Sequence, residues 1–511
     1  MKEYKKYNSI YDWLSEISTN YPKRVALIER KKRITFAQLK RYSDSIANYL
    51  VSYGIKKGES VGIFLPNGWE YVAILFAISK IGAVAVPIND CIKSKELSVI
   101  LDDAKIKLFF AHDSLIHIVK GSIAAINYGQ VVWVGKDVKG TRFKNILTLS
   151  PLVKTNLWKE DDLAMIFYTS GTSGESKGVM LSNKNVLFSV DSTREFFNVN
   201  KKDRVFLMLP MFHSYSLITA VLTPLLSGTS IYIANKERSF NLLSKIVESK
   251  ATIFLGIPDI YHALYKLELP FRFRFFNKIK IFVSGAAPLH RDILETIEKK
   301  FKKSKLIEGY GLTEATGAVT ANSLEARKIG SVGKALPNVE IKIVSNSGKE
   351  CKANEVGEIL VKSDGIMLGY LNKDELTANR LKNGWLHTKD LGYFDEDGFL
   401  FLKGRKSELI IFNGLNIYPL EIESVLDRFE GVKKSAVIGY KSSKNIEKIV
   451  AFIELERGED ISIKKLDEYA RGFLADYKIP HKYVIIDKLP RNSTGKIIKA
   501  ELENYALINI G

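Results

Sequence analysis

The sequence predicts an α/β protein, in which a large N-terminal domain of layered α/β sheets and a barrel-like β subdomain precede a small α+β C-terminal domain. Three observations predict this fold class. The chain has 511 residues, more than one hydrophobic core usually supports. Its first half alternates helical and strand patterns, which is typical of parallel sheets covered by helices. Beyond Gly330, short strands are separated by glycine turns.

The alternation can be followed along the first half of the chain. Residues 34–55 carry apolar side chains at helical spacing, and residues 59–65 form an apolar run typical of a buried strand. Residues 69–88 repeat the order of helix and strand. Further strands are predicted at 204–210, 229–234, 251–258 and 279–287, with a helix at 217–226 between the first two.

The second half of the chain differs in pattern. The segments "GEILVKSDGIMLGY" and "GYFDEDGFLFLKGR" predict a barrel-like or meander subdomain. The final hundred or so residues form a separate α+β pattern with balanced charge, since 18 lysines and arginines face 16 acidic residues from Gly404 onward. The predicted border lies at "GRKSE" (404–408), which gives domains 1–404 and 405–511.

The charge and the cysteines exclude several classes of protein. The net charge of +19 would suit a nucleic-acid partner, but no long basic block occurs, so no nucleic acid is expected. In residues 270–282 aromatic and basic residues alternate, which is more typical of a half-buried strand or a surface ledge. Cys91 and Cys351 lie far apart without CxxC spacing, which predicts neither a disulfide framework nor a zinc site.

The N-terminal residues lack the apolar core of a signal peptide. The uncharged stretch 205–235 is long enough to span a membrane, but it contains Pro210, His213, Pro224 and many hydroxyls. It is therefore predicted to form strand, loop, buried helix and strand. The expected location is the cytoplasm, while peripheral membrane contact and oligomeric state stay open.

The stretch "YTSGTSGESKGVMLS" (168–182) has the composition of a phosphate-binding loop. Its glycines allow sharp turns, its hydroxyls are donors, and Lys177 supplies a positive charge. It is not a Walker A loop, because Ser176 rather than glycine precedes the lysine. The structural alternative is an ordinary solvated loop.

Four further stretches contain candidate functional residues. They are "EGYGLTEATG" (308–317) with Thr313 and Glu314, residues 384–423 with Asp390 and Arg405, "LPRNSTGKIIK" (489–499) with Lys496, and "LPMFHSYSL" (209–217) with His213. Taken singly, each has an ordinary explanation as a turn aspartate, a solvated carboxylate, a surface lysine or a core histidine.

In this order and spacing, the five stretches resemble the adenylate-forming superfamily of acyl-CoA synthetases, luciferases and peptide-synthetase adenylation domains. The resemblance extends from about residue 10 to about residue 500. It implies that a carboxylate attacks the α-phosphate of ATP with Mg²⁺ present, and that coenzyme A then displaces AMP from the acyl adenylate. Bringing two anions together requires positioning and cationic stabilisation.

The resemblance also implies roles for individual residues. Glu314 and Thr169 would hold Mg²⁺, and Thr313 would lie at the α-phosphate. The residues implied to bind the β- and γ-phosphates are Thr169, Ser170, Gly171, Thr172, Ser173, Gly174 and Lys177. Those implied to line the adenine slot are Gly285, Ala286, Ala287, Gly309 and Tyr310, and the neighbouring Glu308 and Gly311 are implied to bind the nucleotide. Asp390 would accept the ribose hydroxyls, and Arg405 would support the sugar or its phosphate.

The small C-terminal domain is implied to be mobile and to adopt one pose for each half-reaction. Lys496 would neutralise charge during adenylation, Gly414 would line the thiol tunnel, and His213 would gate the acyl site. "GRKSE" matches the hinge, although Ser407 stands where the family usually has Asp or Lys, which puts the usual charge contacts in doubt.

The "FHSYS" stretch contains no carboxylate that could pair with the ammonium group of an amino acid. The resemblance therefore favours a medium- or long-chain fatty-acid:CoA ligase. The alternatives are an aryl-CoA ligase of the 4-coumarate or benzoate type and a fatty-acid:acyl-carrier-protein ligase. A nucleotide-sensing scaffold without activity would be expected to lack Lys496 or Asp390, and both are present.

Overall fold

The computed structural model describes residues 3–123, 130–135, 141–152, 158–170, 176–234, 239–269, 273, 277–412, 415–441, 447–491 and 497–509. The chain divides into two compact units. Unit 1 comprises Met1–Thr169, Lys177–Ile341 and Val361–Leu386. Unit 2 comprises Ser170–Ser176, Lys342–Leu360 and His387–Gly511.

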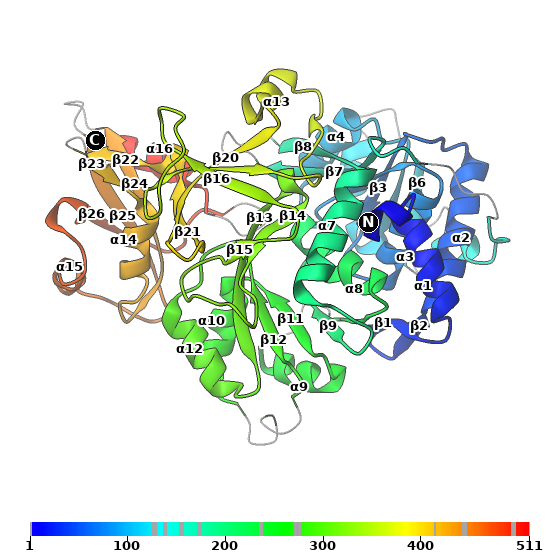
Figure 1. Cartoon of the computed structure of the whole chain (residues 1–511), viewed down its shortest axis with the longest axis horizontal. Helices are drawn as coiled ribbons and strands as arrows, with labels where there is room; N and C mark the ends of the chain where they lie inside the picture. The colour runs from blue at the N-terminus through cyan, green and yellow to red at the C-terminus, as the bar shows by residue number, and fades with distance from the viewer. Residues whose placement is uncertain are drawn as a thin grey trace. The chain divides into compact units, whose positions relative to one another are not determined.

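Unit 1 contains a nine-stranded sheet (Figure 1). In spatial order, its strands are β15 (Lys334–Ala335), β14 (Gly317–Ala321), β13 (Lys305–Leu312), β12 (Ile281–Ser284), β11 (Ile253–Gly256), β9 (Arg204–Leu207), β10 (Ser230–Ile233), β1 (Val25–Glu29) and β2 (Lys32–Thr35). The six strands from β13 to β1 are parallel, and β14, β15 and β2 join antiparallel at the two edges. The short apolar runs of the inner strands fit a sheet that is covered on both faces.

A second, seven-stranded sheet completes the strand layers of unit 1. In spatial order, its strands are β18 (Gly369–Tyr370), β8 (Ser176–Ser182), β7 (Leu163–Ser170), β4 (Val84–Pro87), β3 (Ser60–Phe64), β5 (Leu108–His112) and β6 (Gln130–Val134). Strands β7, β4, β3, β5 and β6 are parallel, and β18 pairs antiparallel with β8.

Helices and helical turns connect these strands. They are η1 (Glu3–Lys6), α1 (Ile10–Asn20), α2 (Phe36–Tyr53), α3 (Trp69–Lys80), α4 (Ser94–Asp103), η2 (Asp113–Leu115), α5 (Ile116–Ile123), α6 (Phe143–Ile146), α7 (Asn183–Phe197), the π-helix η3 (Tyr215–Leu222), α8 (Thr223–Leu226), α9 (Ser239–Ser249), α10 (Pro258–Lys266), α12 (Arg291–Lys300), η4 (Thr313–Ala315) and α13 (Asp374–Arg380). No helix among the described residues is long and apolar enough to cross a membrane.

Helix α3 contacts both sheets, because it packs on β1 of the first and on β3 and β4 of the second. Every residue of α3 except Glu70 is buried, which explains why its sequence is apolar all round. Its last residue, Lys80, is also buried, and its Nζ donates to Asp44 Oδ1 at 2.7 Å and to Tyr11 OH at 3.1 Å. Burial lowers the pKa of Lys80, while the carboxylate of Asp44 opposes that shift. The contacts of Lys80 with Tyr11 and Asp44 therefore connect α3 to α1 and α2.

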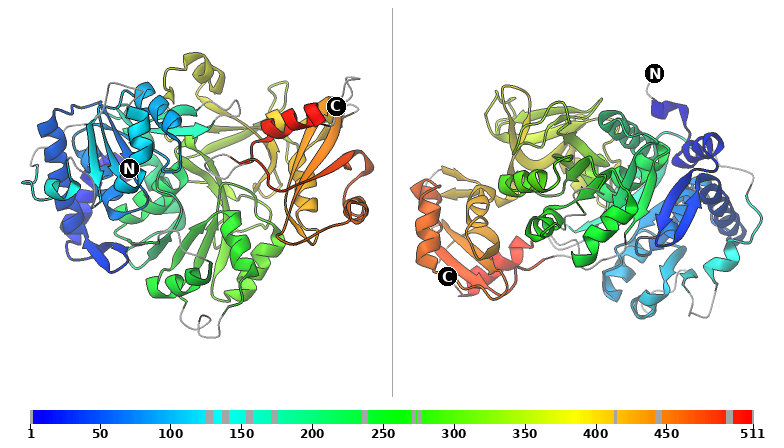
Figure 2. Two further views of the ribbon diagram at one scale, coloured as in Figure 1. Left: turned by 180° about the vertical axis from the view of Figure 1, so that it is seen from behind. Right: turned by 90° about the horizontal axis from the view of Figure 1, so that it is seen from below.

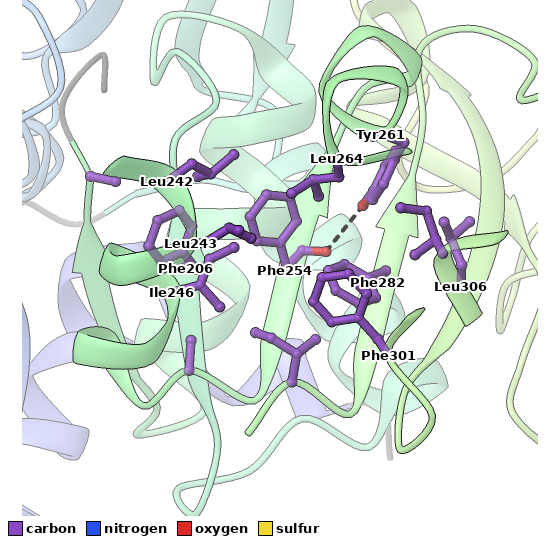
Figure 3. Packing of buried hydrophobic residues seen from close by; sticks show 14 of the residues in the cluster. Phe206, Leu242, Leu243, Ile246, Phe254, Tyr261, Leu264, Phe282, Phe301 and Leu306 are labelled. Carbon is purple, nitrogen blue, oxygen red and sulfur yellow. Dashed lines mark hydrogen bonds between the residues drawn. The ribbon is translucent and has the colours of Figure 1, made fainter. Parts of the chain in front are cut away.

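An aromatic core fills one face of the nine-stranded sheet beneath helices α9, α10 and α12 (Figure 3). The ring centroid of Phe282 lies 4.8 Å from that of Phe301, 5.5 Å from Phe254 and 6.0 Å from Tyr261. The hydroxyl of Tyr261 donates to the carbonyl of Val283 at 2.8 Å, so its polar atom is satisfied inside the core.

Unit 2 contains both antiparallel and parallel strand pairs. A further sheet consists, in order, of β16 (Glu340–Val344), β17 (Gly357–Lys362), β20 (Trp385–Phe394) and β19 (Leu381–Lys382), and β21 (Leu400–Arg405) pairs with β20. Strand β19 belongs to unit 1, β21 belongs to unit 2, and the borders of the units fall within β16, β17 and β20. A two-stranded ribbon, β22 (Ile410–Phe412) and β23 (Leu415–Ile417), follows the turn η5 (Lys406–Glu408).

The C-terminal part of unit 2 has its own core. The three-stranded sheet consists of β24 (Val432–Lys441), β25 (Glu447–Leu455) and β26 (Lys482–Ile486). Its helices and turn are α14 (Pro419–Leu426), α15 (Ile463–Arg471), η6 (Asp476–Lys478) and α16 (Lys499–Asn509). Figure 2 shows α16, coloured red, lying against this sheet, where Leu502 and Ala506 enter the core.

The predicted fold class is confirmed. The segments expected at 34–55 and 59–65 are α2 and β3, and those expected within 69–88 are α3 and β4. The uncharged stretch 205–235 forms β9, the helices η3 and α8, and β10 rather than one long helix. Parts of the predicted ledge at 270–282 lie outside the described residues. The domain border after Gly404 stays a prediction.

We expect Phe282→Ala to lower the free energy of unfolding of unit 1 by about 3–5 kcal/mol, because it opens a cavity among packed rings. Urea unfolding followed by tryptophan fluorescence measures the loss. The matched control is Val99→Ala on α4, where the side chain is 52% exposed, and it should change stability by no more than about 0.5 kcal/mol. Equal effects of the two substitutions would contradict the assignment of this core.

Candidate active site

Strand β12 ends at a segment of small residues, Gly285, Ala286 and Ala287, which the sequence assigned to the adenine slot. A Cβ atom on Gly285 would lie 3.0 Å from the ring of Tyr215, so this position leaves little room for a side chain. Ala286 has a φ of 72°, in the left-handed region. The backbone of this segment is therefore held in an unusual conformation beside η3.

Glu308 lies on β13 directly opposite Ser284 and is 6% exposed. Its Oε1 accepts the backbone N–H of Leu289 at 3.2 Å, and its carboxyl also accepts the N–H of Gly330. Burial raises the pKa of Glu308 to about 7, and these hydrogen bonds only partly oppose the shift. This side chain thus links the segment after β12 to the loop after β14.

The hairpin of β13 and β14 is unusually close at its glycines. A Cβ on Gly311 would lie 2.0 Å from the carbonyl oxygen of Gly317, and one on Gly309 would lie 3.0 Å from that of Thr320. The strand register shifts between Tyr310 and Gly311. The sequence between the strands forms η4, which contains both Thr313 and Glu314. Glycine at these positions therefore fixes the turn that presents the two candidate residues.

Thr313 and His213 lie in neighbouring segments. Thr313 is buried, and its Oγ1 lies 3.0 Å from Oγ of Ser214, the residue after His213. His213 Nδ1 accepts the backbone N–H of Tyr215 at 3.3 Å, and burial lowers the pKa of the imidazole. The neutral form is therefore favoured at the start of η3, next to η4.

Glu314 and Lys177 are brought to the same tyrosine, Tyr370. The hydroxyl of Tyr370 donates to Glu314 Oε1 at 2.8 Å, and Lys177 Nζ lies 6.0 Å from the centroid of its ring. Strand β18 carries Tyr370 alongside β8, which carries Lys177. Burial and the Glu314 carboxylate raise the pKa of Tyr370, so it stays protonated and able to donate. Tyr370 lies outside the five sequence stretches that contain candidate functional residues.

Thr169 lies near the end of β7, and Lys177 lies near the start of the next strand, β8. The positions predicted between them, Gly171, Thr172, Ser173 and Gly174, lie outside the described residues, as does the side chain of Ser170. The structure therefore describes the two ends of the predicted phosphate loop and not the loop itself.

Asp390 and Arg405 form a pair within unit 2. They are opposite each other on β20 and β21, and Arg405 Nε lies 3.3 Å from Asp390 Oδ1. Asp390 is 8% exposed, and its backbone N–H donates to Thr388 Oγ1 at 3.0 Å. Lys496 and Gly414 lie outside the described residues.

Next to this pair is a charged cluster that the sequence analysis missed. Glu358 on β17 is 6% exposed and faces two lysines and a histidine: Lys406 Nζ at 3.1 Å, His387 Nδ1 at 3.5 Å and Lys389 Nζ at 3.8 Å. The hydrogen bond from Lys406 and the charges of its neighbours outweigh burial and lower the pKa of Glu358. Lys406 belongs to the predicted hinge.

Glu314 and Thr169 are hard oxygen donors that suit Mg²⁺. Among the described residues, no group of three or more His, Cys, Asp or Glu side chains could hold a metal ion. A single carboxylate fits a Mg²⁺ ion that takes most of its remaining ligands from phosphates and water.

Two protein-family models match the chain. The model of the AMP-binding enzyme covers residues 14–371, and that of the AMP-binding enzyme C-terminal domain covers residues 421–496. The chain is 32% identical to the long-chain-fatty-acid–CoA ligase FadD13 of Mycobacterium tuberculosis in an alignment of 506 positions, which covers 96% of this chain and 98% of that protein.

Solved structures agree with the family models. The structure of the anthranilate CoA ligase AuaEII in complex with anthranoyl-AMP matches with a TM-score of 0.92 at 26% identity, over 99% of this chain and 98% of that one. O-succinylbenzoate coenzyme A synthetase from Bacillus subtilis, in complex with ATP and magnesium ion, matches with a TM-score of 0.85 at 29% identity, over 96% and 98% of the two chains.

The fold and these matches define an enzyme of the adenylate-forming superfamily, an acid–thiol ligase. The chain belongs to the family of AMP-binding enzymes.

The buried carboxyl of Glu308 should make stability depend on pH. The pKa of Glu308 rises from 4.5 to about 7 on folding. The contribution of its protonated carboxyl to the free energy of unfolding is therefore fully present below pH 4.5 and is lost as the pH rises through 7. The loss amounts to about 3 kcal/mol. Glu308→Gln keeps an accepting oxygen but carries no charge, so it should not lose this free energy of unfolding. Its advantage in stability over the original protein should therefore grow by about that amount between pH 5 and pH 8.

Urea unfolding at the two pH values measures this difference. The exposed Glu325 provides the matched control, Glu325→Gln, which should leave the pH dependence unchanged. If Glu308→Gln unfolds with the same pH dependence as the original protein, the carboxyl is not held protonated by burial.

Proposed function

We propose that this enzyme activates a fatty acid of medium or long chain with Mg²⁺ and ATP, and transfers the acyl group to coenzyme A. In the first step a carboxylate oxygen attacks the α-phosphorus, the bond between the α- and β-phosphates breaks, and pyrophosphate leaves. In the second step the thiol gives up its proton, its sulfur attacks the acyl carbon, and AMP leaves. The observation that carries the proposal is the convergence of Lys177 and Glu314 on Tyr370.

Each candidate residue has a role in the first step. Lys177 binds the outer phosphates, and Tyr370 orients Glu314 through its hydroxyl. A Mg²⁺ ion bound by Glu314 and Thr169 would offset the negative charge of the phosphates. Thr313 donates to the α-phosphate, while Gly285–Ala287 and Gly309–Gly311 present their backbone to the adenine base.

Further roles fall to residues of unit 2. Asp390 accepts the ribose hydroxyls, and Arg405, its partner at 3.3 Å, supports the same sugar or its phosphate. Lys496 neutralises charge as the carboxylate meets the α-phosphate, and Gly414 lies beside the thiol in the second step. The hinge at 404–408 separates the domains 1–404 and 405–511 that alternate between the two steps.

The uncharged helix η3 supports an apolar substrate tail. Its eight residues contain no charge, all but Tyr215 are buried, and it packs against the uncharged strand β14. The similarity to FadD13, a long-chain-fatty-acid–CoA ligase, points to the same substrate class.

An aryl acid is the second candidate. The ring of Tyr215 lies against Gly285 at the start of η3, and an aromatic side chain at this place supports a flat substrate. Two of the matched structures are ligases named for anthranilate and O-succinylbenzoate, both of which contain an aromatic ring. A carrier-protein thiol in place of coenzyme A is the remaining alternative.

Pyrophosphate release over a panel of aliphatic, aryl and amino acids tests the proposal. We expect release to require ATP, Mg²⁺ and an acid, and aliphatic acids of medium or long chain to give the highest kcat/KM. Parallel assays with coenzyme A and with an acyl carrier protein identify the thiol. A preference for aryl acids would support the second candidate, and formation of ADP and phosphate would contradict the reaction itself.

Tyr370→Phe should weaken Mg²⁺-dependent use of ATP by about tenfold, because Glu314 loses the hydroxyl that orients it. The measurement is the Mg²⁺ concentration that gives half-maximal pyrophosphate release. Tyr483→Phe is the matched control, since it removes a tyrosine hydroxyl 3.1 Å from Asp467 in unit 2. An unchanged Mg²⁺ requirement in Tyr370→Phe would show that this hydrogen bond does not serve the metal site.

A further inference from the structure

The chain on either side of residues 492–496 is anchored at two described points. Arg491 and Ile497 form an antiparallel bridge, and the backbone N–H of Ile498 donates to the carbonyl of Pro490 at 2.9 Å. On the N-terminal side, the N–H of Leu489 donates to Glu454 Oε2 at 3.1 Å. On the C-terminal side, the first residue of α16 is Lys499, three positions after Lys496.

Lys499 is a charged side chain in a nearly closed environment, with 15% of its surface exposed. Its Nζ lies 2.7 Å from Glu423 Oε1 on α14 and 2.9 Å from Glu408 Oε2 in η5. Burial lowers the pKa of Lys499, but the two carboxylates more than offset this and leave the pKa above its usual value. Glu503 on the next turn of α16 also faces this cluster.

The two carboxylates are themselves fixed to different parts of unit 2. Glu423 Oε1 also accepts the backbone N–H of Val437 at 2.8 Å, which fastens it to β24. Glu408 follows Ser407 in the hinge stretch. A buried ammonium shared by two carboxylates is a strong and directional anchor.

We infer that Lys499 is a positioning residue for the adenylation half-reaction, because it fixes the point at which the chain re-enters the fold three residues after Lys496. The inference rests on the proposed role of Lys496. A displacement of about 1 Å in a charged group that must meet a transition state can cost about 100-fold in rate. Lys499 also couples that point to Glu408, so a change at the hinge is transmitted to the segment carrying Lys496.

The first test compares the two half-reactions in Lys499→Met. We expect acyl-adenylate formation, followed as pyrophosphate release, to lose about 10- to 100-fold in kcat with little change in KM for ATP or acid. Thioester formation from synthetic acyl-AMP and coenzyme A should stay within about threefold, which also shows that the variant is folded. Equal losses in both half-reactions would overturn the inference.

The matched control is Lys478→Met. Lys478 Nζ lies 2.6 Å from Glu421 Oε1 on the same helix α14, and its side chain is 17% exposed. This control removes a comparable ion pair that has no direct link to Lys499. It should leave the ratio of the two half-reactions unchanged, and a shift of that ratio as large as in Lys499→Met would contradict a specific role for Lys499.

The second test asks whether Lys499 acts through Lys496. Lys496→Ala alone should slow adenylation by several orders of magnitude, and adding Lys499→Met should then cause less than about a twofold further loss. A further loss of tenfold or more would mean that the two residues act independently, which would overturn the inference.

Hydrogen exchange gives a readout that does not depend on activity. In Lys499→Met, the amides of Ile497 and Ile498 should exchange at least tenfold faster, whereas amides of β12 should not change. Unchanged exchange at Ile497 and Ile498 would refute the anchor itself. If no acid gives pyrophosphate release while these amides do exchange faster, the anchor stands and the proposed reaction fails.

Discussion

The close approach of β13 and β14 is the constraint on which the candidate site depends. With the carbonyl of Gly317 only 2.0 Å from where a Cβ of Gly311 would lie, no other residue fits without moving the backbone. This contact fixes the turn η4, and η4 fixes Thr313 against Ser214 and Glu314 against Tyr370. The positions of the Glu314 carboxylate and the Thr313 hydroxyl therefore depend on the lack of a side chain at Gly311.

Much of the fold could be predicted from the sequence because its signals are local. Alternating helical and strand patterns placed α2, β3, α3 and β4 nearly at their observed bounds, and the apolar run of α3 is explained by its burial between two sheets. Motif residues close in sequence, such as Thr313 and Glu314, were also identified. The π-helical form of η3 was not, since no composition signal separates it from an ordinary helix.

The contacts that the sequence did not reveal join residues far apart in the chain. Tyr370 is 56 residues from Glu314, and Lys406 is 48 residues from Glu358. Neither a tyrosine after a glycine nor an acidic residue in a strand is unusual by itself. The backbone N–H of Met367 donates to the carbonyl of Glu314, which holds the segment before β18 against η4, and the pairing of β18 with β8 brings Tyr370 to Lys177. The order of β17 and β20 in their sheet brings Glu358 to His387 and Lys389. These contacts follow from the order of the strands in the sheets and cannot be read from the local sequence pattern.

Two lysines with little exposure join different kinds of element in this chain. Lys80 joins three helices of unit 1, whereas Lys499 joins α16 to the turn η5, which follows β21. At Lys499 two carboxylates share one ammonium group. At Glu358, by contrast, one carboxylate faces the side chains of Lys406, His387 and Lys389. If Lys406 turns away, the carboxylate keeps two neighbours and is never left as an isolated buried charge. Losing the contact with Lys406 therefore costs less free energy than breaking a buried pair that has a single partner, and this position of the chain tolerates a displacement of Lys406.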